Sequence, residues 1–200
     1  FGQNVTGDYG DSDVWGETVG DVILKPDAKT VRLVPWYKEP TAQIIHDAFY
    51  FDGSAVDVSS RVVLKNVLKL FESIGLSPVV APELEFFLVE QNSNSEDPLR
   101  TPLGRSGLPE KAKQAYGIDA VNDFDPLFED IYDYCDIQKI DIDTLSHEAG
   151  AAQMEINFNH GDAIELADQV FLFKRTVRQT AISHKLHATF MAKPMQYQPG

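Results

Sequence analysis

The segment at residues 82–89 carries two glutamates, Glu83 and Glu85, at alternate positions of an otherwise apolar run. Alternate side chains of a β-strand share one face, so the two carboxylates would lie about 7 Å apart. Phe87 and Val89 continue the same face, and apolar surroundings raise the pKa of a carboxyl unless a cation compensates its charge. The pattern favours a cation-binding site, with an exposed sheet face carrying two solvated glutamates as the alternative.

A second segment, at residues 148–158, repeats this arrangement. Its final part predicts a strand with Gln153, Glu155 and Asn157 on one face, and Glu148 leads into it across a loop of small residues. Two such strands are typical of a pair that lines one cavity. Four ionised carboxylates in one cavity repel each other unless divalent ions lie among them, and oxygen ligands suit Mg²⁺ or Mn²⁺.

Other reactive side chains give weaker signals. His184 and His187 stand three residues apart on an expected helix, but surface or core histidines are favoured over a metal pair because no carboxylate stands nearby in the sequence. Cys135 on an amphipathic helix is typical of a buried filler. The sequence has no glycine-rich phosphate loop, dinucleotide fingerprint or serine nucleophile elbow. Any nucleotide phosphates would therefore be held by metals and side chains.

Composition narrows the classes of protein further. The 200 residues are 43% hydrophobic, enough for a core, and the net charge of −14 argues against a nucleic-acid partner. No apolar run reaches the roughly 20 residues of a membrane helix, so we expect no membrane partner. A single cysteine fits a reducing compartment, and we expect a cytoplasmic protein. The chain lacks an initiator Met and ends in a turn-like Pro199-Gly200, so we expect a partial chain.

The elements that must position these residues mix strands and helices. Hydrophobic periodicity predicts strands at 22–24, 30–34, 41–51, 78–89, 153–158 and 188–192. It predicts helices at 61–74, at 125–138 and from a capping box at Asp162 and Glu165 to about 186. Residues 1–21 are expected to be loop, and residues 91–110 a mobile polar insertion. The mixture predicts an α+β fold with a largely antiparallel sheet, and the turn-like segment 35–40 suggests a nearby domain boundary.

At these motifs the chain resembles the glutamine synthetase family. Matching pieces occur in family order over about residues 19–200, at 34–36, 52–53, 59–65, 82–88, 147–155 and 189–194. The sequence around the paired glutamates is more similar to the γ-glutamyl-polyamine (glutamate–putrescine) ligase branch than to the ammonia-using enzymes. The resemblance implies that residues 1–36 end a β-grasp-like domain. Residues 37–200 would begin a catalytic domain with an antiparallel sheet and flanking helices.

The resemblance also implies a reaction. Such an enzyme is an ATP-dependent ligase that joins the γ-carboxylate of glutamate to an amine or ammonium through a γ-glutamyl phosphate, with two Mg²⁺ or Mn²⁺ ions per site. By motif, Glu83 would bind the metal on the ATP side, and Glu85, Glu148 and Glu155 the other. Glu85, Glu148 and Gly200 would bind glutamate. Asp143, a looser match, would lie near the nucleotide.

The family forms homo-oligomeric rings with active sites between subunits, so the loop at residues 1–21 could serve a neighbouring site. The family's histidine loop, phosphate-binding arginines and acidic flap would follow Gly200. Three alternatives stay open: an ammonia-using glutamine synthetase, a ring-forming relative without catalysis, and a glycoside hydrolase that uses a carboxylate pair. The last is disfavoured because one strand face poorly flanks a bond from opposite sides.

Overall fold

The computed structural model describes residues 8, 21–92, 94, 96–110 and 113–200. The chain divides into two compact units, Phe1–Val31 with Gln43–Pro78 and Arg32–Ala42 with Val79–Gly200. Most of the predicted loop at 1–21 lies outside the described residues. The division differs from the predicted domains 1–36 and 37–200. Compactness does not test which family domain a segment belongs to, so that assignment stays a prediction.

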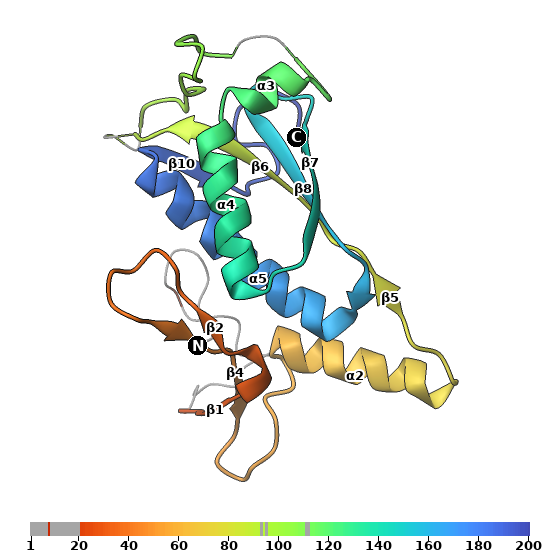
Figure 1. Ribbon diagram of the computed structural model, residues 1–200. Helices are drawn as coiled ribbons and strands as arrows, with labels where there is room; N and C mark the ends of the chain where they lie inside the picture. Colours follow the sequence, from red (N-terminus) through yellow and green to blue (C-terminus); the bar gives the residue numbers. More distant parts are fainter. Residues whose placement is uncertain (1–7, 9–20, 93, 95, 111–112) are drawn as a thin grey trace. The chain divides into compact units, whose positions relative to one another are not determined.

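The second unit is built on a four-stranded antiparallel sheet with the strand order β10-β6-β8-β7 (Figure 1). Its strands are β6 (Glu83–Glu90), β7 (Ile142–His147), β8 (Gln153–Phe158) and β10 (Leu186–Thr189). All the pairings are antiparallel, which confirms the predicted α+β class. The predicted strand at 78–89 is divided into β5 (Val79–Val80) and β6, and the strand predicted at 188–192 lies slightly earlier in the chain.

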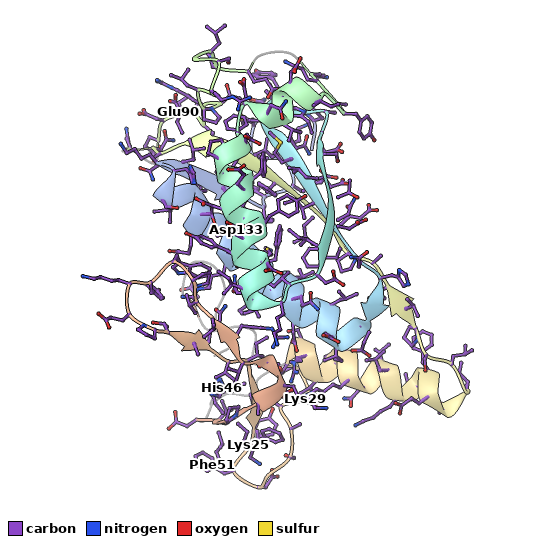
Figure 2. All side chains as sticks on the ribbon, viewed as in Figure 1. Lys25, Lys29, His46, Phe51, Glu90 and Asp133 are labelled. Carbon is purple, nitrogen blue, oxygen red and sulfur yellow. The ribbon has the colours of Figure 1, made fainter. Side chains whose placement is uncertain are left out.

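Two helices, α4 (Asp125–Gln138) and α5 (Ala163–Ser183), supply the rest of the core. The buried cluster joins Phe86 and Leu88 of β6 to Ile131 of α4 and Phe173 of α5. Leu84, Phe86 and Leu88 of β6 therefore face the helices, as the alternation predicts, and Glu83 and Glu85 lie on the opposite face. Asp133 lies on the exposed side of α4 (Figure 2).

The ends of these helices follow their predicted signals. Pro126 stands in the first turn of α4, where its missing N–H breaks no helical hydrogen bond. The Asp162 side chain accepts hydrogen bonds from the N–H groups of Ile164 and Glu165 at the start of α5, as the capping box predicts. The smaller elements of this unit are α3 (Ile118–Asn122) and β9 (Gly161–Asp162), which pairs with β5. Every helix in the described part of the chain is too short or too polar to span a bilayer.

The first unit pairs β1 (Ile23–Pro26) with β4 (His46–Phe49) in an antiparallel ladder and contains α2 (Ser60–Ser73). The predicted strand at 30–34 is wrong in its first part, because residues Ala28–Thr30 form a short 3-10 helix. Asp27 accepts from the N–H of Lys29, and the Thr30 hydroxyl donates to the Asp27 carbonyl; such local bonds compete with a strand ladder. The next short strand, β2 (Arg32–Leu33), belongs to the second unit, and β3 (Ala42–Gln43) lies where the chain returns to the first.

The polar segment 91–110 contains more regular structure than predicted. The N–H of Glu90 donates to Arg100 O, and the Thr101 hydroxyl donates to Glu110 O. Leu103 and Pro109 form an antiparallel bridge. The second half of the segment therefore has regular bonds of its own and one to β6, while its mobility stays a prediction.

Candidate functional site

The carboxylate face of the sheet is formed where β6 and β8 pair. Their register places Glu85 opposite Glu155 and Glu83 opposite Asn157. Like charges directly opposite each other in an antiparallel pair destabilise the sheet. The two predicted strands thus lie side by side, and a carboxylate pair stands on neighbouring strands without an opposite charge between its members.

The electrostatics of Glu155 reflect this crowding. Burial raises the pKa of its carboxyl; a hydrogen bond with Asn157 opposes the rise, and the charges of Glu148, Glu83 and Glu85 add to it. No lysine, arginine or histidine in the described part of the chain forms an ion pair with any of these four glutamates. The face therefore carries negative charge that no ion pair of the described chain balances.

A cavity of about 310 Å³ opens at this face. Its lining includes Glu83 and Glu85, and Gly200 lies at its wall, as does the apolar side chain of Phe87. Gly200 packs closely: a Cβ built on it would clash with the backbone oxygen of Ala192. Of the predicted site residues, Glu148, Glu155 and Asp143 do not line this cavity. Asp143 is exposed on β7 and accepts a hydrogen bond from the Thr144 hydroxyl.

Gln153 links the cavity to the loop that follows Glu148. Its side chain is buried, and its amide nitrogen donates to Glu85 Oε2 at 2.6 Å. Its amide oxygen accepts from the N–H of Gly150 at 2.8 Å. A Cβ on Gly150 would lie 2.6 Å from that oxygen and 2.7 Å from the ring of Phe87, so the loop requires glycine there.

Sequence reasoning missed two buried residues behind this loop. His147 is fully buried, with Nε2 at 2.9 Å from Glu110 Oε2 and Nδ1 at 2.6 Å from the Glu148 carbonyl oxygen. Burial lowers the pKa of His147, but the Glu110 hydrogen bond and charge outweigh it, and the pKa lies above its usual value. In the sequence, only the position of His147 next to Glu148 could have indicated a role for this histidine. Nothing indicated Glu110, because it lies in the segment that was expected to be an insertion.

The donor set suits a hard divalent cation, because carboxylate oxygens gather where no protein cation balances them. The carboxylates are not drawn to one point, however. Within residues 8, 21–92, 94, 96–110 and 113–200, no three His, Cys, Asp or Glu side chains form a group that could hold a metal ion. The site therefore fits a divalent cation in the type of its ligands and in their location on one face, but the ligands do not converge on one point. His184 instead pairs with Asp130 at 2.6 Å, so it does have the carboxylate partner that the sequence analysis did not find, and this partner lies outside the carboxylate face.

Comparison with known proteins agrees with the resemblance seen in the motifs. Residues 57–200 match the family model for the glutamine synthetase catalytic domain. The chain is 38% identical over 152 residues to gamma-glutamylputrescine synthetase PuuA of Escherichia coli (strain K12), covering 74% of this chain and 32% of that protein. It is 30% identical over 184 residues to glutamate--isopropylamine ligase of a Pseudomonas species, covering 90% and 39%.

A solved structure described as apo GmaS without ligand superimposes with a TM-score of 0.78 at 27% identity, covering 94% of this chain and 42% of that one. The chain thus spans between about a third and two fifths of the length of these relatives. The family match covers more than half of the chain, and this disfavours the glycoside hydrolase alternative. The chain belongs to the glutamine synthetase family.

Proposed function

We propose that the full-length protein is an ATP-dependent carbon–nitrogen ligase that joins the γ-carboxylate of glutamate to an amine. The observation that carries this proposal is the uncompensated carboxylate face on β6 and β8, found in a chain of this family. An electronegative face of this kind suits divalent cations, and through them the phosphates of ATP.

The reaction would proceed in two substitutions. A γ-carboxylate oxygen of glutamate attacks the terminal phosphorus of ATP, the bond to the bridging oxygen breaks, and ADP leaves. The amine nitrogen then attacks the carbonyl carbon of the γ-glutamyl phosphate, the C–N bond forms, phosphate leaves with the C–O electron pair, and the nitrogen loses a proton. The product is a γ-glutamyl amide.

Residues of this chain would hold the reactants in place. Glu83 would bind the metal on the nucleotide side and Glu85, Glu148 and Glu155 a second Mg²⁺ or Mn²⁺ ion; when bound, these ions neutralise and align phosphate charge. Glu85 and Glu148 would also bind the glutamate amino group. Gly200 would open the loop that binds glutamate, a role consistent with its place in the wall of the cavity. Asp143 would lie toward the nucleotide.

Assembly and location are part of the same proposal. By analogy with the family, the protein would form a homo-oligomeric ring with active sites shared between subunits, in the cytoplasm. The one cysteine, Cys135, is compatible with this location, because it is buried and burial raises its pKa to about 12. Such a thiol is inert toward disulfide exchange.

The acceptor is proposed to be an organic amine rather than ammonium. Two relatives of this chain are named for amine acceptors, putrescine and isopropylamine, while others are named glutamine synthetase. The test is phosphate release from ATP by the full-length protein with glutamate and a panel of amines. We expect an organic amine to be the best acceptor. Ammonium as the best acceptor would assign the protein to ordinary glutamine synthetases.

A further inference from the structure

Glu110 reaches across the unit to the loop that begins at Glu148. Its side chain is only 8% exposed, and one oxygen, Oε2, serves two partners. It accepts from the N–H of Ala152 at 3.0 Å and lies 2.9 Å from Nε2 of His147. Glu110 stands 42 positions before Ala152, so these bonds join segments that are distant in sequence.

His147 extends the connection to the other end of the loop. Its Nδ1 lies 2.6 Å from the Glu148 carbonyl oxygen, and its ring is completely buried. Both ring nitrogens face oxygens that can only accept, so each is a donor when the ring carries two protons. One carboxylate thus restrains the backbone at Glu148 and at Ala152 together.

The loop needs such a restraint because its backbone is unusual. Ala152 has φ 54, a left-handed conformation that costs free energy for a residue with a Cβ. The Glu148 N–H donates to the Gln153 carbonyl oxygen, so the four intervening residues form a tight turn. Buried carboxylate–histidine contacts such as Glu110–His147 contribute little net stability compared with apolar replacements. Their specific use here is orientation.

We propose that Glu110 is a positioning residue that acts through His147 and Ala152 to fix the Glu148 turn, so that the Glu148 carboxylate is presented to the carboxylate face of β6 and β8. The metal-binding part of this inference rests on the proposed function. Partners that hold a ligand from behind are a general feature of metal sites, and their loss weakens metal affinity by about 10- to 100-fold.

The first experiment measures Mn²⁺ affinity by calorimetry in the full-length protein. Glu110→Ala should weaken binding about tenfold. Glu110→Gln should recover part of this loss, because its amide oxygen can still accept from the Ala152 N–H. The matched control is Glu96→Ala, an exposed glutamate in the same segment, which should leave the affinity unchanged. Equal affinities of Glu110→Ala and Glu96→Ala would overturn the proposal.

A double-mutant cycle separates positioning from general destabilisation. In a Glu148→Gln background, Glu110→Ala should have little further effect on Mn²⁺ affinity, since the ligand that it positions is gone. In a Glu83→Gln background it should keep its roughly tenfold effect. A tenfold effect of Glu110→Ala in both backgrounds would mean that Glu110 acts through the fold as a whole, which would contradict the inference.

Hydrogen exchange in the metal-free protein tests the turn without relying on the proposed function. The peptide covering residues 148–153 should exchange faster in Glu110→Ala than in Glu96→Ala. Glu110→Gln should show a smaller increase, and it replaces Glu110→Ala in this test if the alanine variant does not fold. Unchanged exchange would overturn the proposal. If exchange rises while Glu148→Gln leaves Mn²⁺ affinity intact, the positioning of the turn stands and the ligand assignment fails.

Discussion

Two groups of carboxylates in this molecule differ in how their charge is balanced. In the first unit, Arg61 contacts Asp27 at 2.7 Å and Asp47 at 2.8 Å, and Lys65 contacts Asp47 at 2.6 Å. In the second unit, no cation of the described chain pairs with the carboxylates of Glu83, Glu85, Glu148 and Glu155. The sequence contains acidic residues in both regions, and only the fold separates their roles.

Their pKa values shift in opposite directions. The hydrogen bond from Arg61 holds the pKa of Asp27 below its usual value. Burial raises the pKa of Asp47, but the hydrogen bonds from Lys65 and Arg61 outweigh it, so the net shift is downward. Burial and the neighbouring carboxylates raise the pKa of Glu155. The balanced carboxylates form ion pairs within the first unit, whereas the unbalanced ones are the ligands that we propose for divalent cations.

Glu85→Gln should have the largest effect, because it removes a charge from the centre of the unbalanced group. Gln can still accept the hydrogen bond from Gln153, so the sheet should remain folded. In the full-length protein, we expect product formation to fall at least about a hundredfold, as for a misplaced reactant, measured as metal-dependent phosphate release. Activity equal to the unsubstituted protein would remove Glu85 from the site.

Gly150→Val should follow, with a loss of about a hundredfold in turnover from a displacement on the scale of an ångström. Any side chain at this position would place its Cβ 2.7 Å from the Phe87 ring, so the turn after Glu148 would have to move. The paired control shortens residues 93–100, leaving Glu110 in place, and should preserve most of the turnover. Equal activities of the two variants would mean that the turn is not part of the site.

Arg61→Met breaks the balanced group and should act on stability alone. Removing the arginine leaves Asp27 without its partner and Asp47 with Lys65 only. Because these side chains are partly exposed to solvent, we expect a loss of about 1–3 kcal/mol in the free energy of unfolding, below that of a fully buried pair. Urea unfolding measures this loss. A change in the Mn²⁺ affinity of Arg61→Met, measured where both proteins are fully folded, would contradict the separation of a structural carboxylate group from a metal-binding one.

The smallest expected effect is the pH dependence of the balanced group. The pKa values of Asp27 and Asp47 in the folded protein lie below the usual value of an aspartate, so the unfolded chain takes up protons first as the pH falls. Their contribution to stability is present above about pH 4–5 and is lost as the pH falls through the folded values. Between pH 6 and 3, the free energy of unfolding should decline less steeply in Arg61→Met than in the unsubstituted protein. Parallel declines in the two proteins would argue against a contribution of the Asp27–Arg61–Asp47 ion pairs.

Local patterns in the sequence were sufficient for much of this arrangement. Alternation predicted which side of β6 carries Glu83 and Glu85, and Asp162 predicted the start of α5. The strand expected at 30–34 forms only at Arg32–Leu33, because hydrogen bonds of Asp27 close a turn at its first residue instead. Glu110 and His147 could not be paired from the sequence, since no periodicity relates positions 37 residues apart. The register that places Glu85 opposite Glu155 likewise depends on tertiary pairing.

The central claim is that the unbalanced carboxylates are a divalent-cation site. Its most direct test is the number of Mn²⁺ ions bound per chain by the full-length protein, compared with the double variant Glu83→Gln and Glu155→Gln. We expect two ions per chain in the unsubstituted protein and fewer, more weakly bound, in the variant. The same number of ions with the same affinity in both proteins would contradict it.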